Sequence, residues 1–282
     1  MNPFLLQVIA TALFAVALVK DKSNISRFKI KPREYTFMVF SYLVVFSAVV
    51  AFFTADIHWS LLAQPKYYFG FIALVVLAFG WNKLFYYFED REQLQDFEVV
   101  NLTVPAFTAL LGGIVFPEER SLIVFVGVIV SLIALYMARA HLRQFKINKY
   151  TKTMLFMVVV MAAETVLRKV LLDVFDPATL YFFRVLFVWF LLYLFYRPCR
   201  LPRDLKVWGH TAISNIFGVT AMIIMFYGYI EIGVILTTMV FLLNPILVYI
   251  LDSFVLKEKI RMKNIYASLV ILAAITLVAI LS

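Results

Sequence analysis

Three ionisable side chains in the second half of the chain, Glu164, Arg168 and Arg184, are spaced so that they can pair. Glu164 and Arg168 are four residues apart and would share one face of a helix. Glu164 lies about eight residues before the end of one apolar run, and Arg184 about six residues after the start of the next, so both would be roughly 10 Å deep in a helical hairpin. Two interpretations remain open: a brace that neutralises charge between two helices, or a site for a solute or a proton.

Few other side chains are arranged for covalent or metal chemistry. The single cysteine, Cys199, excludes an internal disulfide and a cysteine-based metal cluster. The three histidines fall in or beside three different loops, and no cluster has the spacing of a metal site or a catalytic site. The ATP-binding motif GxxxxGK(S/T) is also missing from the sequence. We therefore expect no enzymatic activity, no metal and no cofactor.

The elements that would position these residues are membrane helices. Of the 282 residues, 64% are hydrophobic and 15% charged, and the mean hydropathy is +0.93. A helical crossing of the bilayer needs about 20 mostly apolar residues, and the apolar runs do not alternate as the strands of a membrane barrel would. The sequence therefore predicts an all-α polytopic membrane protein with ten spans, at about 3–19, 35–54, 68–88, 95–116, 121–139, 153–172, 178–196, 207–230, 232–256 and 264–281.

The formal net charge of +9 comes from short basic clusters between these runs. This placement favours anchoring at the membrane face over binding of nucleic acid. Twenty of the 26 lysine and arginine residues fall in the odd-numbered loops, the longest of which is expected at Lys20–Glu34. The positive-inside rule places these loops in the cytoplasm and both termini outside.

The two halves of the chain repeat one pattern at an offset of 140 residues. The matched pairs include Pro105 with Pro245, Glu118 with Glu258 and Tyr87 with Tyr227. Each half holds five expected spans, an odd number, so the halves would cross the membrane in opposite senses. We expect a first repeat at 1–140, a connecting loop at 141–152 and an inverted second repeat at 153–282 around a central cavity.

Two groups of residues resemble the EamA-type members of the drug/metabolite transporter superfamily. The first is an apolar run with a proline and a terminal glutamate, VPAFTALLGGIVFPEE at 104–119 and NPILVYILDSFVLKEK at 244–259; the second is Asp176–Thr179 followed by Phe183 and Arg184. The resemblance implies a ten-helix basket whose first, third, fourth, sixth, eighth and ninth helices enclose the cavity. It also implies termini on the inner side, in conflict with the charge count.

On this resemblance, uncharged polar and aromatic residues of these helices are candidates for the lining. An amide in the membrane needs a protein partner or a wet cavity, so helix-to-helix hydrogen bonding is the alternative for each. With the ionisable pair above, the candidate substrate-binding residues are Gln7, Trp81, Asn82, Asn101, Glu164, Arg184, Asn215, Tyr227, Thr238 and Asn244. Pro105 and Pro245, at matched depth within their helices, are candidate bends for switching, or simple kinks.

The sequence thus predicts a secondary transporter that moves a small organic solute, with export of amino acids or related metabolites as the first candidate. Alternatives are an anionic or lipid-linked solute and, from other classes, a membrane scaffold or an intramembrane enzyme. The expected partners are the lipid bilayer, the solute and a coupling proton or exchange solute, with no nucleic acid. The expected location is the plasma (inner) membrane, as a multi-pass integral protein.

Overall fold

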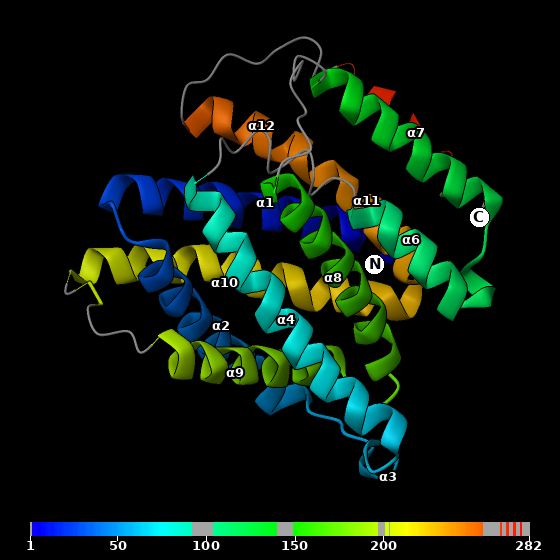
Figure 1. Cartoon of the computed structure of the whole chain (residues 1–282), viewed down its shortest axis with the longest axis horizontal. Coiled ribbons are helices and arrows are strands. Elements are labelled where there is room, and N and C mark those ends of the chain that lie inside the picture. The colour runs from blue at the N-terminus through cyan, green and yellow to red at the C-terminus, as the bar shows by residue number, and fades with distance from the viewer. Residues whose placement is uncertain are drawn as a thin grey trace.

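The computed structural model describes residues 2–91, 104–139, 149–196, 201–202 and 204–255, with residues 266, 269–270, 273–274 and 277. Within these residues the regular structure is helical, apart from one isolated β-bridge between Ile57 and Phe175. Figure 1 shows the helices α1 (Pro3–Phe28), α2 (Pro32–Thr54), α3 (Trp59–Leu62), α4 (Pro65–Arg91), α6 (Val104–Val115), α7 (Leu122–Arg139), α8 (Lys149–Leu171), α9 (Pro177–Tyr196), α10 (Leu205–Glu231), α11 (Val234–Val240) and α12 (Asn244–Val255). Two 3₁₀ turns complete this part of the chain, η1 (Pro117–Glu119) and η2 (Phe241–Leu243).

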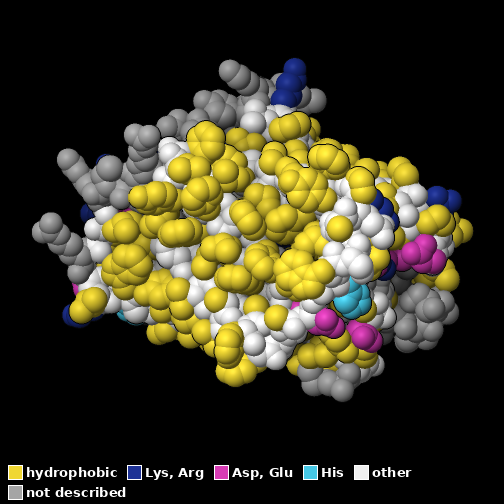
Figure 2. Space-filling view, turned by 90° about the horizontal axis from the view of Figure 1, so that it is seen from below, with side chains coloured by type: hydrophobic (Ala, Val, Ile, Leu, Met, Phe, Trp, Pro, Cys, Tyr) yellow, Lys and Arg dark blue, Asp and Glu magenta, His cyan; other side chains and the backbone are white. Residues whose placement is uncertain are grey.

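The expectation of an all-helical membrane protein is confirmed for these residues. Five described stretches are long and apolar enough to cross a membrane: Pro3–Phe28, Arg33–Thr54, Pro65–Leu84, Pro177–Phe195 and Leu205–Glu231. Large hydrophobic side chains such as Phe52 and Leu122 are 80% exposed, and Figure 2 shows a face covered mainly by hydrophobic side chains. Such a continuous apolar surface suits contact with lipid. The arrangement of ten spans as inverted repeats remains a prediction, and most of the tenth expected span lies outside the described residues.

The first helix is longer than we expected. The apolar run ends near residue 19, but α1 continues to Phe28 and ends where Lys29 adopts a left-handed conformation, with φ of 49°. The expectation of a long connection at Lys20–Glu34 is therefore wrong. Ile25 and Phe28 pack against a buried cluster that includes Tyr35 and Val207, which holds the polar end of the helix in place. Hydropathy marks where apolar side chains end, whereas packing decides where the helix ends.

The helices pack in pairs that join the two halves. α1 packs against α10 and α12, α8 packs against α4 and α6, and α2 packs against α9. The main buried cluster follows these contacts and includes Leu74 of α4, Val185 of α9, Phe226 of α10 and Met239 of α11. α8 begins at Lys149, so the last four residues of the connecting loop expected at 141–152 are helical.

Asp176 fixes the start of α9, in the motif that the sequence resemblance used. Its carboxylate accepts hydrogen bonds from the backbone N–H groups of Ala178 and Thr179, each at 3.1 Å. It also accepts from the backbone N–H of Asp56, at 2.9 Å, beyond the end of α2. A carboxylate that satisfies the free N–H groups of a first helical turn stabilises that helix start. One side chain thus caps α9 and ties it to the loop after α2.

The expected ninth span contains a short 3₁₀ turn within its length. α11 gives way to η2 at Phe241, and α12 begins at Asn244. Pro245 is the second residue of α12 and lies just after this turn. Val240, Phe241 and Asn244 keep right-handed helical backbone angles, so the chain stays helical through the turn. A proline has no N–H to donate to the preceding turn, so this geometry allows the bend expected at Pro245, which stays a prediction. Pro105 is likewise the second described residue of α6, and the residues before Val104 lie outside the description.

Candidate solute-binding cavity

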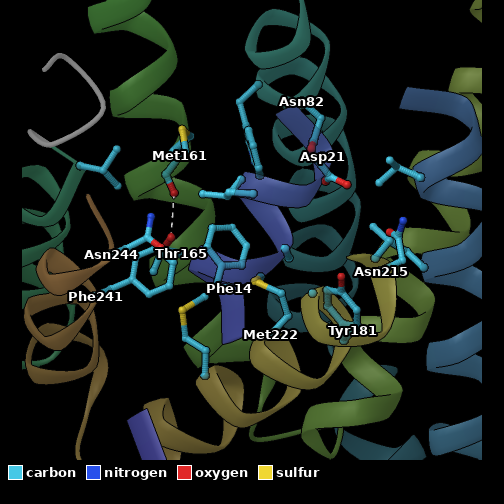
Figure 3. Close-up of a pocket in the computed structure, with 18 of the residues that line it drawn as sticks. Phe14, Asp21, Asn82, Met161, Thr165, Tyr181, Asn215, Met222, Phe241 and Asn244 are labelled. Atoms are coloured by element: carbon cyan, nitrogen blue, oxygen red, sulfur yellow. Dashed lines mark hydrogen bonds between the residues drawn. The ribbon is translucent and has the colours of Figure 1, made fainter. Parts of the chain in front are cut away.

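A cavity of about 270 Å³ lies among the helices of both halves. Figure 3 shows side chains that line it. Each of ten elements contributes at least one lining residue: Phe14 (α1), Val39 (α2), Asn82 (α4), Pro105 (α6), Thr165 (α8), Tyr181 (α9), Asn215 (α10), Thr238 (α11), Phe241 (η2) and Asn244 (α12). A concave site of mostly apolar lining with a few placed polar groups is the usual form of a small-molecule site.

Two asparagines of the lining are held by their own helices. The side-chain amide of Asn82 donates to the carbonyl of Ala78, and that of Asn215 donates to the carbonyl of Thr211, each at 2.7 Å. The amide oxygen of Asn244 differs, because it is buried and has no hydrogen-bond partner among the described residues. A buried acceptor without a donor is unfavourable. This atom therefore marks a place where a ligand donor would be accepted.

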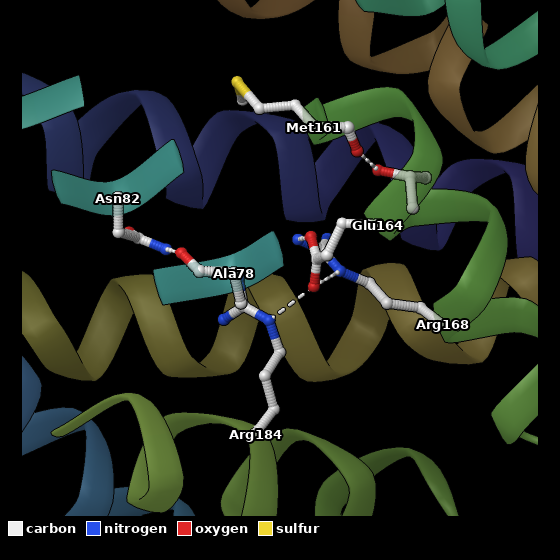
Figure 4. A network of polar contacts seen from close by, with 7 residues as sticks. Ala78, Asn82, Met161, Glu164, Arg168 and Arg184 are labelled. Atoms are coloured by element: carbon white, nitrogen blue, oxygen red, sulfur yellow. Dashed lines mark hydrogen bonds and ion pairs between the residues drawn. The ribbon is translucent and has the colours of Figure 1, made fainter. Parts of the chain in front are cut away.

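The ionisable residues singled out in the sequence meet at the wall of this cavity (Figure 4). Glu164 is fully buried, and one of its carboxylate oxygens accepts from Nε of Arg184 and from Nε of Arg168, each at 2.7 Å. Its other oxygen accepts from a terminal nitrogen of Arg168. Two guanidinium groups thus share one carboxylate, and the three side chains carry a formal charge of +1.

Aromatic rings support the two arginines. The guanidinium carbon of Arg184 lies 5.8 Å from the centroid of the Trp81 ring, and that of Arg168 lies 5.3 Å from the Phe226 ring. Both arginines line the cavity, whereas Glu164 is not part of the lining. The geometry therefore makes Glu164 the residue that positions the arginines. It leaves the guanidinium groups as the cationic part of the wall.

The structure brings seven of the predicted residues together around the cavity: Trp81, Asn82, Arg184, Asn215, Thr238, Asn244 and Pro105. Three others are placed elsewhere, and Glu164 behind the arginines is the first of them. Gln7 is buried between helices, where its amide donates to the carbonyl of Ile224 at 2.9 Å, and this bond satisfies the group without a cavity. Tyr227 is 40% exposed on the outer surface of α10, so it was wrong to place it on the lining.

Two predicted positions have no described side chain. Asn101 lies outside the described residues, and of Pro245 only the backbone is described.

The sequence analysis missed two charged residues of the lining, Asp21 and Lys22, because the expected first span ended before them. Asp21 follows Phe14 and Leu18 on the cavity face of α1. The spacings of four and seven residues from Phe14 are those of one helix face. Continuing this period past Val19 would have found it.

A second group of polar contacts, outside the cavity lining, joins the two halves of the chain. The carboxylate of Glu119, in η1, forms a salt bridge with Lys169 of α8. It also accepts from the backbone N–H of Ile235 in α11, at 3.0 Å. Glu118, the glutamate of the sequence motif, is exposed. Glu119 is therefore the residue that joins the η1 turn of the first half to two helices of the second.

Comparison with known proteins gives the family and the fold. Residues 150–280 match the EamA-like transporter family, a family of membrane transporters rather than enzymes. A solved crystal structure matches with a TM-score of 0.76 over 99% of this chain and 96% of that chain, at 14% sequence identity, which shows the fold alone. No curated protein matches the chain. The apolar helices and the family together make this an integral membrane protein. The resemblance predicted from the sequence is thus confirmed for residues 150–280, which match the EamA-like transporter family.

Proposed function

We propose that this chain is a secondary transporter that binds a small organic solute in the cavity and exposes it to the two sides of the membrane in turn. The single observation that carries the proposal is the cavity itself, which helices of both halves enclose. Its mixed lining fits a solute with an apolar body and hydrogen-bonding groups. Export of amino acids or related metabolites, driven by a proton gradient or an exchange solute, is the first candidate activity.

The helix contacts support two halves related by an inverted repeat. If α1, α4 and α6 correspond to α8, α10 and α11–α12, the contact of α1 with α10 corresponds to that of α8 with α4. In the same way, the contact of α1 with α12 corresponds to that of α8 with α6. α2 and α9 would correspond to each other, so the contact between them is matched by the same contact. Two halves whose helix contacts correspond in this way can rock against each other around a central site, as alternating access requires.

The test is solute flux in proteoliposomes, measured as counterflow of labelled amino acids and small carboxylates. Gly218 of α10 lines the cavity, and a Cβ there would meet only Ala17, at 3.8 Å. Gly218→Leu should therefore fill part of the cavity and abolish flux. Gly209→Leu is the matched control, because Gly209 lies on the same helix with nothing within 4 Å of its Cβ position. Flux in the control and not in Gly218→Leu supports the proposal.

Two results would contradict it. Equal flux in both glycine variants would place the transport path elsewhere, and no flux of any solute would favour a membrane scaffold. A chemical change in the solute without its movement across the membrane would favour an intramembrane enzyme.

One observation favours a narrower second candidate, an anionic or lipid-linked solute. Arg168 and Arg184 line the cavity and share a single carboxylate, so the wall has an excess positive charge. Arginine suits planar carboxylate and phosphate groups because its donors are fixed in a fork. On this candidate, inorganic phosphate or a small monocarboxylate should raise the melting temperature of the purified protein, and the matched neutral amide should not.

A further inference from the structure

The cavity carries a negative side chain as well as the two arginines. Asp21 of α1 lines it, and its carboxylate accepts a hydrogen bond from the hydroxyl of Tyr35 and lies beside Ser214. Both of these partners are neutral, although Lys22, the next residue along α1, also lines the cavity. The Asp21 side chain is partly buried, and a carboxylate that is partly withdrawn from water and has only neutral partners among the described residues is unfavourable. Asp21 therefore favours an occupant that brings a positive charge.

The distance between Asp21 and the arginines follows from the packing of α1 on α10. Three contacts set the register: Gln7 lies against Gly228, Ala17 against Gly218, and Asp21 against Ser214. The two helices therefore run antiparallel, with Asp21 at the level of Ser214.

The arginines lie at another level of α10. Arg168 packs on the ring of Phe226, twelve residues after Ser214. At 1.5 Å per residue these two levels are about 18 Å apart along the helix. The negative and the positive group thus stand near opposite ends of the cavity.

The lining between the two ends is largely apolar. Phe14 and Leu18 of α1, Met222 of α10 and Phe241 of η2 belong to it. Figure 3 shows Phe14, Met222 and Phe241 among the side chains drawn around the cavity, with Asp21 and Tyr181 at separate places on its wall. An apolar body between two charged groups would therefore be accommodated.

We propose that Asp21 is a cation-recognising residue of this cavity and that the solute is an elongated ampholyte. Its ammonium group lies against Asp21 and Ser214, its apolar body along the aromatic and methionine side chains, and its acid group against Arg168 and Arg184. The proposal rests on the proposed function, because it names the solute class for the same cavity. It narrows the amino acids and related metabolites of that function to those with the amine and the acid at opposite ends, because an α-amino acid carries both on one carbon atom and reaches only one end of the cavity at a time.

The experiment measures binding to the purified full-length protein with amino carboxylates that carry the amine and the acid at opposite ends of an alkyl chain. Aminobutanoate, aminohexanoate, aminooctanoate and aminododecanoate form the series, and the carboxylate of equal length without the amine is the reference for each. We expect the advantage over the reference to be absent for the shortest probe and to grow with length. Asp21→Asn keeps the shape and the hydrogen bond with Tyr35. It should reduce the affinity for aminododecanoate about ten-fold or more and leave the affinity for the reference carboxylate unchanged.

Asp173→Asn is the matched control. Asp173 also accepts a hydrogen bond from a tyrosine, Tyr67 at 3.2 Å, but it is exposed at the end of α8 and does not line the cavity. This variant should bind the whole series as the unaltered protein does. The length series needs no variant, so the test holds even if Asp21→Asn does not fold.

Three results would overturn the inference: an amine advantage that does not depend on length, an Asp21→Asn protein that keeps the advantage, or one that changes only the pH dependence of binding. The last would make Asp21 a proton site only. Flux in proteoliposomes separates this inference from the proposed function. Length-dependent binding without flux would support the Asp21 subsite and contradict the transport function. Flux without length dependence would support the transport function and contradict the Asp21 subsite.

Discussion

Glu164 neutralises two buried guanidinium groups, and its charge should matter more for stability than for contact with the solute. Glu164→Gln leaves Arg168 and Arg184 buried together without a counter-charge, and a broken buried ion pair typically costs about 3–5 kcal/mol. We expect a loss of that order in the free energy of unfolding, measured by denaturant titration in detergent. Glu118→Gln is the control, because Glu118 is an exposed carboxylate and should change stability little.

The double variant Glu164→Gln with Arg184→Gln returns the cluster to its formal charge of +1, so it should recover part of this loss. A Glu164→Gln protein with unchanged stability would contradict the positioning role. If the same protein also lost transport, Glu164 itself would be the group that meets the solute or the proton.

At this scale the sequence predicted the pairing of Glu164 with Arg184 because helical rise fixes the depth of a residue in its span. It did not predict which way a residue faces. Gln7 and Tyr227 lie on the expected helices, yet one is satisfied between helices and the other is on the outer surface. The rotation of a helix is set by its neighbours, and hydropathy shows it poorly when lipid-facing and protein-facing sides are both apolar.

Among the elements, the turn between α10 and α11 depends on a glycine. Gly233 has φ of 83°, and a Cβ at this position would lie 2.7 Å from the carboxyl carbon of Glu119. Gly233→Ala should therefore lower the melting temperature, because it adds backbone strain and displaces the carboxylate that binds Lys169 and the N–H of Ile235. Gly209→Ala, in the open part of α10, should leave the melting temperature unchanged or raise it slightly. Equal melting temperatures for the two variants would show that the contact of Glu119 contributes nothing.

The 3₁₀ turn η2, just before Pro245, should matter for switching. Pro245→Ala restores an N–H group and allows a regular α-helix through this turn, so we expect slower flux with ligand binding retained. Pro177→Ala is the comparison, since Pro177 is the first residue of α9, where the carboxylate of Asp176 already fixes the helix start. Flux rates in proteoliposomes and melting temperatures with ligand distinguish the two. Unchanged flux in Pro245→Ala would make this proline a passive feature of the fold.

The sequence predicted helices where apolar runs are long, and the span expected at 178–196 agrees with α9 to within one residue. It did not predict the extension of α1 to Phe28 or the 3₁₀ turn before Asn244. The extension of α1 depends on packing against residues far along the chain, such as Val207. Asp21 was missed because the expected span ended at residue 19, although the helical period that begins at Phe14 reaches it.

At the scale of the whole molecule, the structure brings the basic end of α1 to the start of α10. Phe28, at the end of α1, stacks near His210 of α10 at 5.6 Å between ring centroids. The end of α1 and the start of α10 therefore lie together, so Lys206 of α10 is at the same end as the basic residues between Lys20 and Arg33. Arg168, which the charge count assigned to a loop of the opposite side, is 4% exposed inside the protein. This correction strengthens the charge difference between the two ends.

The positive-inside rule then places the basic end in the cytoplasm and the N-terminus outside, against the orientation implied by the family resemblance. Cys199 tests this, because it is the only cysteine and lies in the connection between α9 and α10, outside the described residues. A membrane-impermeant maleimide should leave Cys199 unlabelled in intact cells and label it after permeabilisation, and a Cys199→Ser protein should give no signal in either case. Labelling in intact cells would reverse the orientation, and it would also place the Asp21 end of the cavity, which lies nearer to this connection, on the outer side of the membrane.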